Sequence, residues 1–276
     1  MTERNITFRV RRYNPEKDER PYYQEFTVPI HKGMTVLDGL HYIKREIDNS
    51  LAWRYSCRMG VCGSCAMLVN GKAMLACNTQ ITDISETMIV VAPLPNFSII
   101  RDLVPDLAGM FSKHQSVQPF IQRTDEGEMV KPTGEYEQSP EELESYLQFS
   151  YCIRCGACMS ACPTLATDQD YLGPMPLTQA FRYNSDSRDD GKKPRNGAVD
   201  TPHGAYRCHF GSECSRVCPK GVDPAKAIQL MKRQLVFDFL GLLKKPAACT
   251  KVITEPRTTG RREGIPEAPP FTIEQS

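Results

Sequence analysis

The sequence lacks an apolar run long enough to cross a lipid bilayer. The nearest candidate, residues 235–243, is short and contains Asp238. The first ten residues have neither the apolar core of a secretory signal nor the serine- and arginine-rich, acid-poor composition of a transit peptide. The net charge is +1, so no excess of one sign favours nucleic acid as a partner. We therefore expect a soluble or peripheral protein in a reducing cytosol.

Two kinds of catalytic motif are missing as well. The sequence contains no glycine-rich dinucleotide fingerprint and no credible catalytic triad. Its 276 residues suffice for one large or two ordinary domains. The chain has many cysteines, which can bind metal, but no catalytic site of its own. It is therefore most simply interpreted as a carrier of electrons.

Cysteine, in contrast, is abundant, and eleven of the 12 cysteines fall into three dense runs. A disulfide framework is disfavoured because the chain is long and many of its cysteines lie only two residues apart. Structural zinc needs two Cys-x2-Cys pairs to close one tetrahedron, whereas the second run places its four cysteines together and ends in Cys-Pro. Iron–sulfur ligation fits these spacings better. The twelfth cysteine, Cys249, fits no run and is interpreted as a structural or exposed free thiol.

The first run has the spacing Cys-x4-Cys-x2-Cys, which is typical of plant-type [2Fe–2S] proteins. A further cysteine follows after eleven residues and closes the far iron. Glycines within the run fit this interpretation, because a cluster leaves little room for side chains and needs backbone amides directed at its sulfurs. The predicted [2Fe–2S] ligands are Cys57, Cys62, Cys65 and Cys77.

The second and third runs are variants of the bacterial two-cluster pattern. In that pattern the fourth cysteine of each run ligates the cluster of the other run. The spacing therefore predicts a [4Fe–4S] cluster held by Cys152, Cys155, Cys158 and Cys218.

The third run lacks one ligand of the full pattern, because Gly211 stands where a cysteine is expected. Three thiols remain for the last cluster: Cys162, Cys208 and Cys214. A cubane without its fourth cysteine can lose one iron, so we predict [3Fe–4S] at this site. The alternative is a [4Fe–4S] centre with a non-cysteine fourth ligand.

Hydrophobic periodicity predicts an α+β fold. Strands are expected at 6–10, 25–30 and 88–92, a helix at 36–47 with Thr35 as its N-cap, and a hairpin at 66–76 around an Asn70–Gly71 turn. With the cluster loop at 54–65, these elements indicate a β-grasp ferredoxin domain over residues 1–105.

The later part of the sequence is predicted to be helical. One helix is expected after Ser139, and another after Asp223 with an apolar stripe of Ile228, Met231, Leu235 and Phe239. Residues 106–245 are assigned to an α-helical two-cluster domain, in which the polar stretch 119–140 is a linker or surface loop. Residues 246–276 are expected to form a tail that is extended on a partner or partly disordered.

The segments SCRMGVCGSC, CIRCGACMSACP and CHFGSECSRVCPKGVDP closely resemble the iron–sulfur subunit of succinate dehydrogenase and quinol:fumarate reductase. The resemblance covers residues 5–245 and includes all three motifs in order. It implies that the β-grasp domain packs against a flavoprotein subunit with FAD, while the helical domain docks on a membrane anchor that can carry haem. Electrons then pass from FAD through the three clusters to quinone, and the dicarboxylate chemistry belongs to the flavoprotein.

On this resemblance the chain is expected to be a subunit of a succinate:quinone oxidoreductase, peripheral to the cytoplasmic face of a prokaryotic membrane. A quinol:fumarate reductase working in the reverse direction is the near alternative. A free-standing ferredoxin is an alternative of a different class, which the long linker and the tail disfavour.

The resemblance also indicates a quinone pocket beside Pro163 and His209. Members that reduce ubiquinone carry a tryptophan pair after this proline, whereas the matching residues here are Ala166 and Thr167. The only tryptophan, Trp53, is distant in the sequence. We therefore expect menaquinone to be the natural partner.

Overall fold

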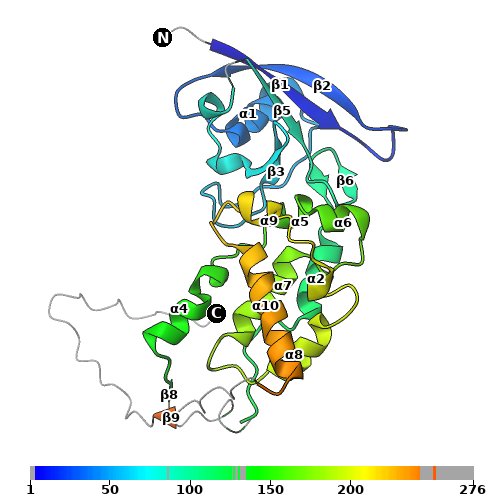
Figure 1. The fold of residues 1–276 in the computed structure, drawn as a ribbon. Helices are drawn as coiled ribbons and strands as arrows, with labels where there is room; N and C mark the ends of the chain where they lie inside the picture. The colour runs from blue at the N-terminus through cyan, green and yellow to red at the C-terminus, as the bar shows by residue number, and fades with distance from the viewer. Residues whose placement is uncertain are drawn as a thin grey trace, which may run out of the picture.

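The computed structural model describes residues 4–85, 87–125, 127, 130, 135–242 and 251–252 (Figure 1). The strands are β1 (Arg4–Arg12), β2 (Tyr22–Ile30), β3 (Ala66–Val69), β4 (Lys72–Leu75), β5 (Met88–Ala92), β6 (Ile99–Arg101), β7 (Val104–Pro105), β8 (Glu135–Tyr136) and β9 (Lys251–Val252). The α-helices are α1 (Val36–Tyr42), α2 (Ala108–Ser116), α4 (Pro140–Ser150), α5 (Ala157–Ser160), α6 (Pro163–Thr167), α7 (Pro174–Asn184), α8 (Lys192–Val199), α9 (Glu213–Arg216) and α10 (Pro224–Phe239). Short 3-10 or π turns are η1 (Ile43–Ile47), η2 (Ala76–Asn78), η3 (Ile81–Asp83) and η4 (Ala205–Arg207).

The N-terminal region is built on a five-stranded mixed sheet with the order β2-β1-β5-β3-β4. Strand β1 pairs with β5 in parallel and with β2 in antiparallel orientation. Alternate residues of β1 are buried, as one face of a sheet requires: Ile6, Phe8 and Val10. Helix α1 covers this face so closely that a Cβ atom at Gly39 would lie 2.3 Å from Cζ of Phe8. This arrangement confirms the predicted β-grasp fold.

The local signals read from the sequence are confirmed at several turns and caps. Helix α1 begins at a capping box, in which the Asp38 amide donates to Thr35 Oγ1 at 3.2 Å and the Thr35 amide donates to Asp38 Oδ2 at 2.9 Å. The hairpin between β3 and β4 turns at Asn70 and Gly71, whose φ angles of 48° and 78° are both positive, as a type I′ turn requires. The predicted helix 36–47 continues past α1 only as the π turn η1.

A buried ionic network joins the sheet to the segment that leads into the first cysteine run. Asp102 is 2% exposed and accepts hydrogen bonds from Arg12 Nε at 3.0 Å and from the Ala52 amide at 2.9 Å. Arg12 also donates to Asp48 at 2.6 Å. Because each buried charge is paired, the network fixes residues 48–52 against β1 without leaving an unpaired ion in the core.

The helical region has a second core, centred on α7, which packs against α4 and α10. In α10 the apolar stripe predicted from the sequence is buried at Ile228, Met231 and Leu235. The prediction is wrong for Phe239, whose side chain is 90% exposed. Val236 and Phe237 are exposed too, so the last turn of α10 stands outside the core that covers its earlier turns.

The described part of the predicted linker 119–140 is fastened to the surface of the helical core. Arg195 is fully buried and pairs with Asp189 at 2.8 Å, while it also donates to the backbone oxygens of Gln118 and Phe120. The Gln122 amide donates to the other oxygen of Asp189 at 3.0 Å. The buried guanidinium of Arg195, on α8, thus holds this segment against the helix.

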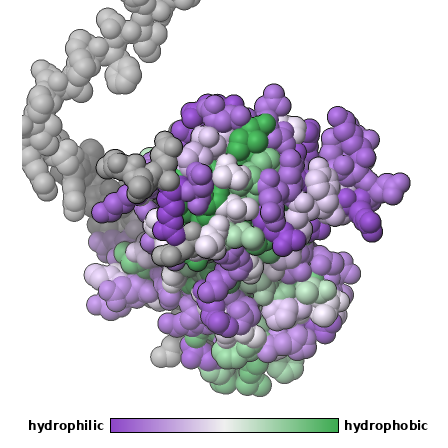
Figure 2. Space-filling view, turned by 90° about the horizontal axis from the view of Figure 1, so that it is seen from above, coloured by the Kyte–Doolittle hydropathy of each residue, from purple (hydrophilic) through white to green (hydrophobic). Residues whose placement is uncertain are grey.

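No helix within the described ranges is both long and apolar enough to span a membrane. Most of the predicted tail 246–276, including Cys249, lies outside the described residues. Seen from the end that carries the sheet, the molecule is largely hydrophilic, with hydrophobic areas in the upper middle of the view and at its lower edge (Figure 2).

Candidate iron–sulfur cluster sites

The first cysteine run forms a loop whose backbone amides point at thiol sulfurs. The amides of Val61 and Cys62 each donate to Cys57 Sγ at 3.3 Å, and the amide of Gly60 donates to Cys77 Sγ at 3.2 Å. Positive φ angles at Arg58 (60°) and Gly60 (69°) give the loop this curvature. Amides directed at sulfur are the surroundings that a [2Fe–2S] cluster needs, so this loop fits the group.

The thiols of this loop have contrasting acidities. Burial raises the pKa of Cys62, but hydrogen bonds from the Cys57 and Ser64 amides and the Ser64 hydroxyl outweigh it and lower this pKa to about 6. Burial and the neighbouring Cys77 thiol raise the pKa of Cys65 to about 12. Cys62 is exposed and Cys65 is buried, so the loop has one outer, easily ionised thiol and one inner thiol that ionises only with a positive partner.

The second run meets the end of the third around one small cavity. Its walls include all four thiols that the spacing assigned to one cluster: Cys152, Cys155, Cys158 and Cys218. Burial raises the pKa of Cys155 most, the Cys152 and Cys218 thiols add to this, the Ala157 amide opposes it, and the net pKa is about 11. Grouped thiols whose ionisation is disfavoured by their neighbours fit a positive centre, which the irons of a cluster would supply.

The remaining three thiols line a second cavity: Cys162, Cys208 and Cys214. Gly211 and Pro163 also line it, and a Cβ atom at Gly211 would lie 3.2 Å from Pro163 Cγ. The Phe210 amide donates to Cys208 Sγ at 3.4 Å, in a turn whose φ angles are positive at Phe210 (58°) and Ser212 (57°). Three grouped thiols with an inward amide fit a cluster as well.

Tyr171 also lines this second cavity and is missed by the sequence analysis. Its hydroxyl is buried and has no hydrogen-bond partner among the described residues. The position Asp-Tyr-Leu-Gly before α7 carries no cysteine and no metal-binding spacing, so no signal in the sequence identifies it.

The first and second runs touch each other at Gly63. A Cβ atom there would lie 2.7 Å from Cys155 Cβ and 3.1 Å from the Ile153 carbonyl oxygen. Only glycine permits this approach, and its φ of +75° is a further reason for glycine. The predicted ligand loops of two clusters are therefore in direct backbone contact, although they are some ninety residues apart.

Other polar contacts fix the later runs in place. The Asn96 side-chain amide donates to three carbonyl oxygens at the end of α5, those of Met159, Ser160 and Cys162, at 3.0–3.1 Å. Ser215, between Cys214 and Cys218, donates to Asp223 Oδ1 at 2.5 Å and accepts from the Ala225 amide at 3.0 Å. The third run is thereby tied to the N-terminus of α10.

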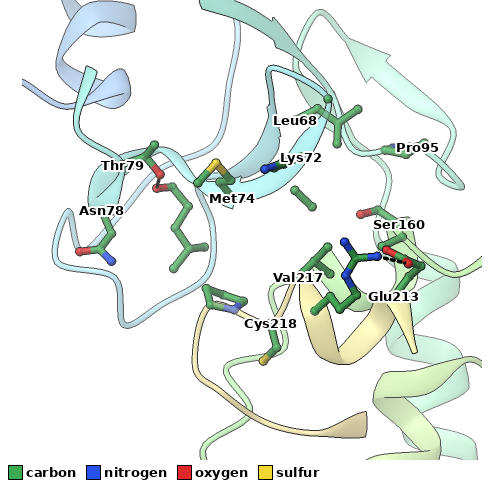
Figure 3. Close-up of a pocket in the computed structure, with 16 residues that line it drawn as sticks. Leu68, Lys72, Met74, Asn78, Thr79, Pro95, Ser160, Glu213, Val217 and Cys218 are labelled. Atoms are coloured by element: carbon green, nitrogen blue, oxygen red, sulfur yellow. Dashed lines mark hydrogen bonds and ion pairs between the residues drawn. The ribbon is translucent and has the colours of Figure 1, made fainter. Parts of the chain in front are cut away.

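A groove of about 600 Å³ separates the β3–β4 hairpin from α9 and the end of α5. Figure 3 shows Lys72, Met74 and Thr79 on the hairpin side, with Glu213 and Val217 opposite them. The sulfur of Cys218 points away from the hairpin, toward the second run (Figure 3). The Cys218 thiol therefore lines the cavity of the second run, whereas the backbone of Cys218 lines the groove.

The residues predicted for the quinone site lie on the surface near the third run. Pro163 and His209 are both exposed, and Pro163 adjoins Gly211, two residues from His209. Ala166 and Thr167, on α6, are exposed as well. The structure thus places Pro163 beside the third run and leaves His209, next to Cys208, exposed on the surface.

Comparisons with known proteins identify iron–sulfur domains over both regions that carry the cysteine runs. Residues 7–112 match the family model of the 2Fe-2S iron-sulfur cluster binding domain, and residues 148–222 match the 4Fe-4S dicluster domain. The fold and its cysteine sites thus define an iron–sulfur protein with a [2Fe–2S] domain followed by a dicluster domain.

Relatives over the greater part of the chain narrow this class to one family. The chain is 46% identical to the fumarate reductase iron-sulfur subunit of Mycobacterium tuberculosis, over 82% of this chain and 91% of that one. It is 41% identical to the mitochondrial succinate dehydrogenase [ubiquinone] iron-sulfur subunit of Candida glabrata, over 84% and 92% of the two chains. A chain of the Mycobacterium smegmatis Sdh1 complex in the apo form superposes with a TM-score of 0.77 at 25% identity, over 86% and 98%. The protein belongs to the family of iron–sulfur subunits of succinate dehydrogenase and fumarate reductase.

Proposed function

We propose that this chain is the electron-transfer subunit of a membrane-bound succinate:quinone oxidoreductase. The observation that carries the proposal is the series of three cysteine sites: the first loop touches the second run at Gly63, and the second and third runs each place one thiol in the cavity of the other. Such a series suits a chain of electron carriers between two partners. The relatives named fumarate reductase and succinate dehydrogenase support the same function.

The ligand sets are proposed as the spacing predicts them. The first loop holds [2Fe–2S] through Cys57, Cys62, Cys65 and Cys77. The second site holds [4Fe–4S] through Cys152, Cys155, Cys158 and Cys218. The third site holds [3Fe–4S] through Cys162, Cys208 and Cys214.

When bound, the clusters accept and release single electrons, which come from FAD on a flavoprotein subunit and leave to quinone at a membrane anchor. The chain's own residues set the conditions for this transfer. The amides of Gly60, Val61 and Cys62 stabilise negative charge on the first loop's sulfurs. Gly63 keeps the first and second sites in contact.

We further propose the finer features of the complex. The chain binds peripherally at the cytoplasmic face of a prokaryotic membrane, on an anchor that can carry haem, and the quinone lies beside Pro163 and His209. Menaquinone is the favoured partner because small residues, Ala166 and Thr167, leave a wider site than indoles do. Fumarate reduction by quinol uses the same series in the opposite direction.

The test is purification of the complex through a tag on this chain, followed by assay. We expect a flavin-bearing subunit and at least one membrane subunit to co-purify, with succinate oxidation linked to menaquinone. A matched preparation with Cys62→Ala should keep its partners but lose the linked turnover. Recovery of the chain alone, with ferredoxin-like cluster signals and no flavin, would support a free-standing carrier and reject the proposal.

A further inference from the structure

Tyr171 is a fully buried tyrosine whose hydroxyl is unused. Its side chain is 0% exposed, between α6 and α7. The backbone is fixed on both sides, because the carbonyl oxygen accepts from Lys113 Nζ at 2.7 Å and the amide donates to the Asp168 carbonyl oxygen at 3.3 Å. The hydroxyl, in contrast, makes no hydrogen bond with any described residue. Leaving a buried hydroxyl unsatisfied is costly, so such a group indicates a missing partner.

The position of Tyr171 identifies that partner. Its side chain lines the same cavity as Cys162, Cys208 and Cys214, which are the three thiols of the third site. A phenol keeps its proton at neutral pH, so the Tyr171 hydroxyl has a hydrogen to donate to a sulfur in this cavity.

We propose that the Tyr171 hydroxyl donates a hydrogen bond to a sulfur of the three-iron cluster at Cys162, Cys208 and Cys214, and thereby raises the reduction potential of that cluster. The inference rests on the proposed function. Reduction adds one electron, and therefore negative charge, to the cluster. A donor stabilises this more negative state more than the oxidised one, since hydrogen bonds to sulfur help set cluster potentials. The phenol proton stays on oxygen throughout.

A high potential at the third site has a functional consequence. The third site is the last of the series before the quinone, so a stronger acceptor there draws electrons away from the first two sites. Tyr171 affects electron transfer only through the potential of the third cluster, so it is a positioning residue and not a catalytic one.

The test compares two tyrosine variants in the whole purified complex. Tyr171→Phe removes the hydroxyl and keeps the ring. Tyr146→Phe is the matched control, because Tyr146 is equally buried in the same domain but its hydroxyl donates to Gln138 at 2.8 Å, away from the third site. The potential of each is measured by redox titration of the oxidised three-iron EPR signal.

We expect Tyr171→Phe to shift the one-electron equilibrium up to about tenfold toward the oxidised cluster, which corresponds to a potential about 59 mV lower. Tyr146→Phe should leave the potential unchanged. Pulsed EPR in H2O and D2O should detect an exchangeable proton coupled to the wild-type cluster, and this coupling should be lost only in Tyr171→Phe.

The outcomes separate this inference from the function on which it rests. A wild-type three-iron signal with an unchanged potential and a retained proton coupling in Tyr171→Phe overturns the inference and leaves the function intact. Conversion of the cluster type in that variant would make Tyr171 an iron ligand, which also overturns it. Absence of a three-iron signal in wild type overturns the cluster assignment itself. If Tyr171→Phe does not assemble, wild type containing fluorotyrosine, a stronger donor, must show a raised potential, and an unchanged one rejects the inference.

Discussion

The first cluster loop and the two later runs differ in how much of the fold each one needs. All four thiols of the first site come from residues 57–77, and loop amides already point at their sulfurs. The later sites combine thiols from residues 152–162 and 208–218, which meet only when α5, α9 and α10 are packed together. The first site is therefore a local structure, whereas the later two sites form only when the chain has folded into its tertiary structure.

The pKa values of the thiols differ between the first site and the later ones in the same way. Cys62 in the first loop has a pKa lowered to about 6 by amide donors, after allowance for burial, and it is exposed. Burial raises the pKa of Cys158 well above its usual range, and the thiols of Cys152 and Cys155 raise it further. Ionising Cys158 without iron is therefore unfavourable, so the helical core should depend on its clusters for stability more than the sheet does.

Replacement of Cys158 should have the largest effect. Cys158→Ala removes a proposed ligand whose thiol is near thiols of both later sites, and the chain should lose both of their clusters. Iron per chain should fall from about nine to about two, with a lower melting temperature or loss of soluble protein. Iron analysis and thermal unfolding measure this outcome. Retention of both later clusters would contradict the dependence of the helical core on iron.

Replacement of Cys62 tests the other side of the comparison. Cys62→Ala should remove only the [2Fe–2S] signal and lower the iron content from about nine to about seven, because the first site is local. The helical domain and its EPR signals should remain. Cys249→Ser is the control and should change nothing. Loss of a cluster in the control, or of the later clusters in Cys62→Ala, would disprove the ligand assignment.

A third variant asks whether one missing thiol decides the type of the last cluster. Gly211→Cys should convert the third site toward [4Fe–4S], lower its potential and slow electron transfer to quinone strongly. The new Cβ lies 3.2 Å from Pro163 Cγ, so the proline ring must shift by a few tenths of an ångström. Gly211→Ala carries the same crowding without the thiolate and should keep the three-iron EPR signal. An unchanged three-iron signal in Gly211→Cys would count against the assigned geometry.

Much of this arrangement could be predicted from the sequence, for a physical reason. Iron–sulfur ligands are mostly cysteines, and within each run they are spaced as a tight turn allows, so the runs can be recognised in the sequence. Capping at Thr35 and Ser139 and the turn at Asn70 are equally local. Each of these features depends on residues within a few positions of one another.

The features that could not be predicted all depend on distant contacts. Tyr171 lines the cavity of the third site together with residues of α6 and α7, and its sequence neighbours carry no signal. The approach of Gly63 to Cys155 joins two domains. Phe239 follows the apolar period of α10, but the core ends one turn earlier. Hydrophobic periodicity shows which face of a helix is apolar, but it does not show how far along the helix the core covers that face.

The contact between the first and second sites can be tested with two glycines. Gly63→Ala must displace the loop from Cys155, since its Cβ would lie 2.7 Å from Cys155 Cβ. Gly60→Ala is the matched control, with a similar φ of +69° but no atom nearer than 3.7 Å. Both should lose about 1–2 kcal/mol of stability from the positive φ. Only Gly63→Ala should also slow reduction of the second cluster, measured by freeze-quench EPR. Equal slowing in both variants would reject the contact as a determinant of transfer.

The smallest effect is expected at the surface near the third run. His209 is exposed, and we expect His209→Ala to reduce quinone-linked turnover several-fold, because an imidazole beside the quinone oxygen can supply a hydrogen bond or a proton. Succinate oxidation with a dye acceptor should stay nearly unchanged. His203→Ala is the control, since this exposed histidine is engaged with Asp168 at 3.1 Å and should affect neither assay. Equal loss of both activities in His209→Ala would give His209 a structural role, and efficient turnover with ubiquinone alone would refute the menaquinone assignment.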